Sequence, residues 1–188
     1  MTRETWLQIR NAKPPMDGYK GVWFPQSTPK YSFITWLVVK NRVSTADKMR
    51  LWSQQVNTSC VLCNEPMETR NHLFFSCPYS RQVWENTAKR LLQNRFSVDW
   101  REILTYICEK KSDKTRNFIV SYVFQNAIHS VWGERKARRH GESPSPVAAL
   151  VKRIDRKIRN RLSSIRSGGN LKYEGGLQLW FESRQAQD

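Results

Sequence analysis

The sequence of 188 residues has few acidic side chains, three histidines and no long apolar run. No stretch approaches the roughly 18–20 apolar residues of a membrane-spanning helix. Residues 1–15 lack the apolar core of a secretory signal peptide, so secretion is not expected. In an intracellular chain, the four cysteines are better interpreted as reduced thiols or metal ligands than as disulfides. These absences exclude a membrane-spanning protein and a secreted disulfide scaffold.

Basic side chains are abundant. The chain holds 32 Lys and Arg against 16 Asp and Glu, which gives a formal net charge of +16 and a pI near 10.1. Such a charge favours polyanionic partners, nucleic acid before an anionic membrane. Aromatic residues make up 12% of the chain, which excludes a disordered polymer. RNA or DNA is therefore the expected partner, no membrane partner is expected, and the nucleus is the expected location, with the cytoplasm as the alternative.

Apolar periodicity and helix-start residues predict a mainly α-helical fold, with a small irregular zinc knuckle among short helices and two long helices after it. A short helix is expected to begin at Ser44 or Thr45 and to bury Met49 and Trp52. His129 is expected to be packed within a long helix. The other expected helices cover residues 31–39, 78–93, 100–108, 114–139, 146–167 and 173–181.

Three cysteines and one histidine form the strongest motif, Cys60-x2-Cys63-x8-His72-x4-Cys77. The two-residue gap lets both thiolates of one tight turn reach a single ion, and the second pair closes the tetrahedron. Zn²⁺ takes four nitrogen and sulfur ligands in this way, and four protein ligands leave no open position, so the expected zinc is structural. Coincident buried thiols and a Cys60–Cys63 disulfide are the alternatives. Phe74 and Phe75 beside this site are expected to pack in the core rather than to stack on bases.

Several runs around this motif resemble the zinc-binding domain found downstream of reverse transcriptase in plant non-LTR (LINE-type) retrotransposons. The similarity covers about residues 20–112, and later blocks resemble the C-terminal extension of short plant proteins that carry the domain. The runs that carry the main resemblance are PKYSFITWL (29–37), NRVSTADKM (41–49), CVLC (60–63), ETRNHLFFSCPYS (68–80) and Trp84; the later blocks lie at 122–132, 138–142 and 154–164.

The resemblance implies zinc at Cys60, Cys63, His72 and Cys77, and the handling of nucleic acid in a retroelement polyprotein. The catalytic parts of such a polyprotein are not evident in this chain. No Asp-Asp pair of a polymerase occurs, and the acidic residues are too scattered for an RNase H or an endonuclease. The chain is thus expected to be a stand-alone, non-catalytic copy. The expected domains are an extended arm over residues 1–29, the zinc-binding domain over 30–112 and a basic helical extension over 113–188.

Basic residues are concentrated in residues 133–166, where eleven Lys or Arg and three acidic residues give a net charge of +8. At 100° per residue, the last long helix gathers its apolar side chains on one side: Val147, Val151, Ile154, Ile158, Leu162 and Ile165. The candidate phosphate contacts are Arg135, Lys136, Arg138, Arg139, Lys152, Arg153, Arg156, Arg159 and Arg166. Arg161 falls on the apolar side, so it is expected to pair or extend along that side instead. A merely solvated helix face and a membrane-surface helix are the alternatives.

Together these observations predict a non-catalytic, zinc-binding module that binds nucleic acid without sequence specificity. The alternatives are a protein-interaction module that docks a partner through its apolar helices, with a purely structural zinc, and a retroelement relic without a selected function.

Overall fold

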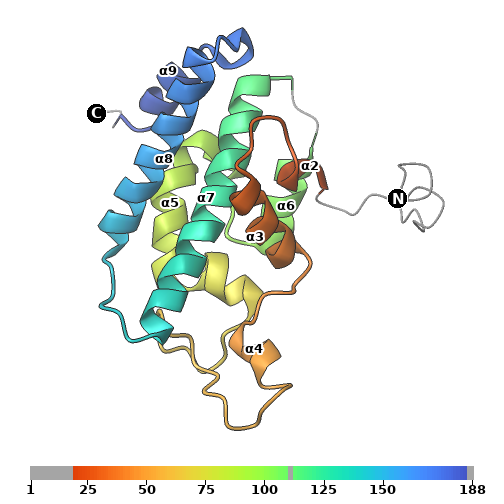
Figure 1. The fold of residues 1–188 in the computed structure, drawn as a ribbon, viewed down its shortest axis with the longest axis vertical. Helices are drawn as coiled ribbons and strands as arrows, with labels where there is room; N and C mark the ends of the chain where they lie inside the picture. The colour runs from red at the N-terminus through yellow and green to blue at the C-terminus, as the bar shows by residue number, and fades with distance from the viewer. Residues whose placement is uncertain (1–18, 110–111, 186–188) are drawn as a thin grey trace, which may run out of the picture.

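The computed structural model describes residues 19–109 and 112–185, and within these ranges the regular structure is entirely helical (Figure 1). This confirms the predicted mainly α fold. Short helices come first, an irregular segment lies between α4 and a π-helix, and the two long helices α7 and α8 precede a short closing helix. The elements are α2 (Tyr19–Val22), α3 (Pro29–Val39), α4 (Ala46–Met49), the π-helix (His72–Ser76), α5 (Pro78–Leu92), a 3-10 turn (Gln93–Arg95), α6 (Trp100–Cys108), α7 (Lys114–Arg139), α8 (Val147–Ser167), a 3-10 turn (Leu171–Tyr173) and α9 (Gly176–Glu182).

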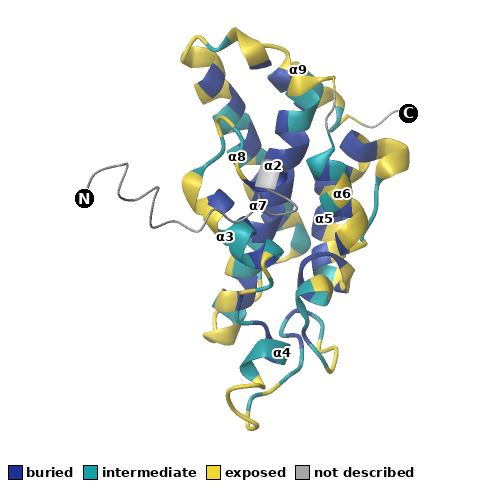
Figure 2. Ribbon diagram, turned by 90° about the vertical axis from the view of Figure 1, so that its right-hand side faces the viewer, coloured by how far each residue is buried: buried dark blue, intermediate teal, exposed yellow. Residues whose placement is uncertain are grey.

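Helix α7 forms the centre of the fold. It packs against α3, α5, α6, α8 and α9, and Figure 2 shows it between α3 and α5 with most of its length buried. Eleven consecutive residues, 118–128, are buried, so this part of the helix is covered on every side. Its buried Gln125 side chain donates hydrogen bonds to the Val22 carbonyl at 2.7 Å and to the Ser32 hydroxyl at 3.3 Å. Polar side chains inside the core therefore tie α2 and α3 to α7.

Capping residues set the ends of α7. The Asp113 carboxylate accepts a hydrogen bond from the Arg116 N–H at 2.9 Å. At the other end Gly141 adopts a positive φ of 81°, which glycine tolerates best, and the Glu142 N–H bonds the Ala137 carbonyl at 3.0 Å. The helix therefore covers the predicted residues 114–139.

Helix α8 is amphipathic and lies along α5 and α7. Its buried residues are Leu150, Ile154, Ile158, Leu162 and Ile165, and the predicted Val147 and Val151 are only half-buried. Pro146 is the N-cap, so the helix begins at Val147, one residue later than predicted. No helix in the described ranges is both long and apolar enough to span a membrane.

Helix α4 differs from its prediction. It has only four residues, and the chain turns away after Met49. Met49 is half-buried, and Trp52 is 74% exposed beside Leu51, which is 77% exposed. The expectation that this helix buries Trp52 is wrong, because the helix ends before the tryptophan and no element of the described ranges covers it.

Contacts run across the predicted boundary at residue 112, because α7 packs on both α3 and α5. The domain boundaries themselves stay a prediction, and residues 1–18 of the expected N-terminal arm lie outside the described residues. In the described part of the arm, α2 packs on α6, where a Cβ built on Gly21 would clash with the Ile107 side chain. Gly21 is thus required by a close approach of two helices.

Candidate metal centre

A tight turn presents the first two cysteines. The N–H groups of Cys63 and Asn64 donate to the Cys60 carbonyl at 3.3 and 2.7 Å, and the Cys60 N–H donates to the Glu65 carbonyl at 2.8 Å. Asn64 closes the turn with a φ of 65°, a left-handed conformation that asparagine adopts more readily than most residues. The turn therefore places both thiols on the same side of the chain.

The other two donors stand at the two ends of the π-helix. In an α-helix, residues five positions apart point about 140° away from each other. Here the Cys77 N–H bonds the His72 carbonyl at 2.7 Å and closes a wider turn, which lessens this angle. The Thr69 hydroxyl accepts from the His72 N–H at 3.2 Å and fixes the start of the turn. This local geometry brings His72 and Cys77 to one site.

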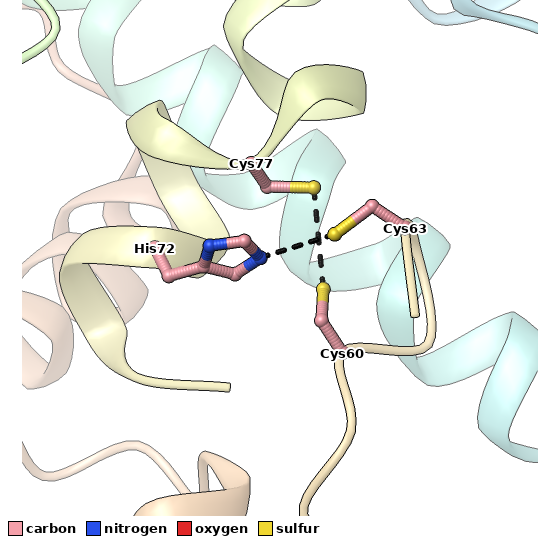
Figure 3. A group of neighbouring side chains, drawn as sticks. All are labelled: Cys60, Cys63, His72 and Cys77. Carbon is pink, nitrogen blue, oxygen red and sulfur yellow. Dashed lines mark hydrogen bonds between the residues drawn. The ribbon is translucent and has the colours of Figure 1, made fainter. Parts of the chain in front are cut away.

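The four donor atoms converge on one point, as Figure 3 shows. The Cys60 and Cys77 sulfurs lie 4.0 Å apart, and the Cys63 sulfur lies 3.2 Å from His72 Nε2. All four donor atoms lie within 4.8 Å of one another. In a tetrahedral zinc site with bonds of about 2.3 Å to sulfur and 2.0–2.1 Å to nitrogen, the donor atoms lie about 3.5–3.8 Å apart. The donor set and its spacing fit one zinc ion.

The surroundings of Cys77 favour its thiolate. The Cys60 thiol donates a hydrogen bond to the Cys77 sulfur, and the N–H groups of Ser80 and Tyr79 at the start of α5 also point at it. Against the opposing effect of burial, these donors lower the pKa of Cys77 to about 5. The same hydrogen bond, followed by burial, raises the pKa of Cys60. Of this pair of cysteines, Cys77 is therefore the one whose thiolate the surroundings favour.

A fourfold protein ligand set leaves no position for water or substrate, so a zinc held here would be structural. Cys60 and Cys77 are fully buried, and Cys63 and His72 are half-buried. Leu73, Phe74 and Phe75, between His72 and Cys77, are buried as well. Phe75 stacks on Phe124 of α7 with ring centroids 5.7 Å apart. Both phenylalanines thus pack in the core as predicted.

A buried ion pair joins the zinc loop to α7. Glu68 is 0% exposed, and the Arg135 side chain, 4% exposed, approaches its carboxylate to 2.7 Å. The same carboxylate accepts from the Ala46 N–H at 3.1 Å at the start of α4, and Arg135 also donates to the Ser44 carbonyl at 2.8 Å. The pair therefore connects α4, the segment before His72 and the end of α7.

Arg135 was expected on the surface as a phosphate contact, and that expectation is wrong. Its guanidinium faces inward because the fully buried Glu68 carboxylate needs a counter-charge. Within a single sequence, nothing marks two residues 67 positions apart as partners.

Arg138 is also turned inward. Its side chain is 12% exposed and pairs with Glu134 at 2.9 Å. It lies 4.4 Å from the Tyr79 ring centroid and donates to the Leu62 carbonyl, inside the cysteine turn, at 3.4 Å. The sequence expectation of a phosphate contact therefore fails for Arg138 too, because this side chain bridges α7, α5 and the cysteine turn.

The remaining candidate phosphate contacts lie at or near the surface. Arg159 is half-buried and pairs with Asp155 at 2.9 Å, and Arg153 approaches Glu134 at 3.7 Å. Arg161 donates to the Gln26 carbonyl at 2.8 Å, which agrees with the expectation that it pairs. The exposed candidates are Lys136, Arg139, Lys152, Arg153, Arg156 and Arg166.

The fold and the site define a helical module built around a closed Cys3His cluster. A family model described as zinc-binding in reverse transcriptase matches residues 1–84, which include all four ligands of that cluster. The match confirms the resemblance stated for the zinc-binding region, and it reaches no catalytic domain. With the cluster, it supports a zinc-binding module from a retrotransposon. None of the curated proteins and none of the solved structures matches the chain.

Proposed function

We propose that this protein is a zinc-stabilised module that binds the phosphate backbone of nucleic acids and catalyses no reaction. The observation that carries the proposal is the outer face of α8. Lys152, Arg156 and Arg166 are exposed there, while Ile154, Ile158 and Leu162 on the other side are buried. A helix fixed by its apolar side presents its cations to phosphates without having to fold on binding.

The charge balance supports a sequence-independent mode of binding. Lys136 and Arg139 at the end of α7 are exposed and add to the cations of α8. Lysine and arginine contacts to phosphates position a protein on nucleic acid but carry no sequence information. The net charge of +16 provides long-range attraction in addition to these contacts.

The closed zinc site supports the absence of catalysis. Catalytic zinc sites keep one position for water or substrate, whereas this cluster supplies four protein donors. In this proposal the zinc holds the cysteine turn against the end of α7, next to the exposed Lys136 and Arg139. The same partner and charge lead us to propose that the protein works in the nucleus.

Fluorescence anisotropy with a labelled 20-nucleotide RNA and a labelled 20-base-pair DNA tests the proposal across a range of salt concentrations. If about five phosphates are contacted, the log–log slope of affinity against salt should be about −4.5 on duplex DNA and about −3.5 on single strands. In the triple variant K152Q/R156Q/R166Q, the magnitude of the salt slope should fall by about 2–3.

The matched control is K89Q/R101Q/K114Q, which removes three exposed cations that form no ion pair within the described residues. This control should lose less affinity than the α8 triple. A wild-type slope near zero contradicts nucleic-acid binding, and equal losses in the two triple variants contradict the assignment to α8.

A second candidate function, a protein-interaction module, is favoured by Leu51 and Trp52, which are 77% and 74% exposed. In that case, the L51S/W52S variant should lose a self-association or partner complex seen by analytical ultracentrifugation, and wild-type binding to RNA should be weak and insensitive to salt.

A further inference from the structure

Two lysine ammonium groups lie close to one tyrosine ring. Lys30 Nζ, at the start of α3, lies 5.5 Å from the centroid of the Tyr31 ring, and Lys157 Nζ, from the middle of α8, lies 5.4 Å from it. The Tyr31 ring in turn lies 4.5 Å from the ring of His129 on α7. Helices α3, α7 and α8 thus bring together two cations that are 127 positions apart in the sequence.

These cations have no acidic partner in the described part of the chain. Neither lysine forms an ion pair there, and the nearest polar partner of Lys157 Nζ is the Ser130 hydroxyl at 3.5 Å. Burial, together with repulsion from Lys30 and Arg153, lowers the pKa of Lys157. The carboxylate of Glu134, on the next turn of α7, is already bound by Arg138 and by the Ser145 N–H.

A pocket of about 230 Å³ opens beside Lys157, between α7 and α8. Its lining includes Ser130, Gly133, Arg153 and Lys157. No heavy atom lies within 4 Å of the point where a Cβ on Gly133 would stand, so the floor of the pocket is open there. The acidic Glu134 and Glu142 also line the pocket, and Glu134 is paired with Arg138 at 2.9 Å and approached by Arg153 at 3.7 Å. The pocket therefore has Arg153 and Lys157 on its border together with two carboxylates, and Lys30 lies outside its lining.

We propose that Lys30, Arg153 and Lys157 form a phosphate-binding site over α7, between α3 and α8, which takes a backbone phosphate of a bound nucleic acid. This inference rests on the proposed function. It adds Lys30 of α3 and Lys157 of α8 to the phosphate contacts proposed for the outer face of α8. A phosphate at this point relieves the repulsion among the three cations and accepts a hydrogen bond from Ser130. The buried Tyr31 ring holds the ammonium groups in place through cation–π contacts.

The test compares K30Q/K157Q with K89Q/K114Q in the anisotropy titration. The control pair removes the same charge, with Lys89 on α5, which lies on the opposite side of α7 from α3 (Figure 2). For K30Q/K157Q, the magnitude of the salt slope should fall by about 1.4 on RNA and about 1.8 on duplex DNA. The affinity at low salt should fall about tenfold. The K30R/K157R variant should keep wild-type binding, because it keeps both charges.

Thermal unfolding of the same variants separates binding from folding. Removing two like charges should leave the Tm of K30Q/K157Q equal to or above that of the wild type, so lost affinity in a stable protein reports on phosphate contact. Equal affinity losses in the two glutamine pairs would overturn the inference while leaving the proposed function intact. A wild-type protein that binds neither probe would overturn both. Binding to phosphatidylserine vesicles is measured as well. If K30Q/K157Q loses binding to these vesicles but keeps wild-type affinity for RNA and DNA, the nucleic-acid assignment of the site is overturned.

Discussion

The two ends of the molecule are stabilised in different ways. The zinc end, residues 41–72 and Cys77 with the end of α7, is held by the four metal ligands, the Glu68–Arg135 pair and the contacts of Arg138. The helical body, α3 and α5–α9, is held by apolar packing around Phe75, Trp84 and Phe124 and along the buried side of α8. The polar contacts of the zinc end are few and directional, whereas the apolar contacts of the helical body are many. Losing a single contact should therefore reduce stability far more at the zinc end.

Zinc removal should have the largest effect. Structural zinc contributes about 10–16 kcal/mol in zinc-finger peptides, far more than any single side-chain contact. Native mass spectrometry should find one zinc in the wild type and none in the C60S/C63S variant. Hydrogen exchange in that variant should lose protection at Asn64 and Glu68, and much less at Val123 and Ile128 in α7. Unchanged protection at Asn64 and Glu68 in the metal-free variant would contradict a zinc-dependent end.

Breaking the buried ion pair should have the next largest effect. The R135M variant leaves the Glu68 carboxylate buried without its counter-charge, which should lower the free energy of unfolding by about 3–5 kcal/mol. The E68Q/R135M double variant should lose less unfolding free energy than the sum of the losses in the single variants E68Q and R135M. Urea denaturation measures the free energy of unfolding of these three variants.

The R139M variant is the control for the ion pair, because Arg139 is an exposed arginine on the same helix. The R139M substitution should lower the free energy of unfolding by less than about 0.5 kcal/mol. A loss in R135M no larger than in R139M would show that the pair contributes nothing to stability.

A small change in the helical body should have a modest effect. Ile158 is 0% exposed and lies on the buried side of α8. The I158V variant should lose about 0.5–1.5 kcal/mol in urea denaturation. Its zinc content and zinc affinity should stay at the wild-type level, since the apolar side of α8 does not contribute to the metal centre. Weaker zinc binding in I158V would show that the two ends are coupled.

The smallest expected effect is a pH dependence from His129. Burial, with help from Lys157 and Lys30, lowers the pKa of His129 to about 4, against an ordinary value of 6.5. Between these values the unfolded chain binds more protons, so His129 should reduce stability as the pH falls from about 6.5 toward 4.

The H129Q variant should flatten this dependence between pH 7 and 5.5, with zinc content checked at each pH. The H140Q variant, in which an exposed histidine is removed, should keep the wild-type slope. Identical slopes in H129Q and the wild type would rule out His129 as the cause.

The comparison of the two ends also explains what the sequence could predict. The helical body follows from local signals, of which the apolar spacing of α8 is the clearest. The ligand spacing likewise predicted the donors that the structure brings together. The positions of Arg135 and Arg138 could not be predicted, because they depend on Glu68 and Leu62, which lie far away in the sequence. The exposure of Trp52 was missed because aromatic character does not show where a four-residue helix ends.

The Glu68–Arg135 pair has a consequence for biosynthesis. Arg135 follows Glu68 by 67 residues. At a synthesis rate of about 5–20 residues per second, Arg135 is made about 3–13 s after Glu68. Once Cys77 has been made, early in this interval, all four metal ligands are present, but the arginine that fixes the segment before His72 is not. A nascent chain can therefore take up zinc before its zinc end is locked, and locking waits for the end of α7 to leave the ribosome.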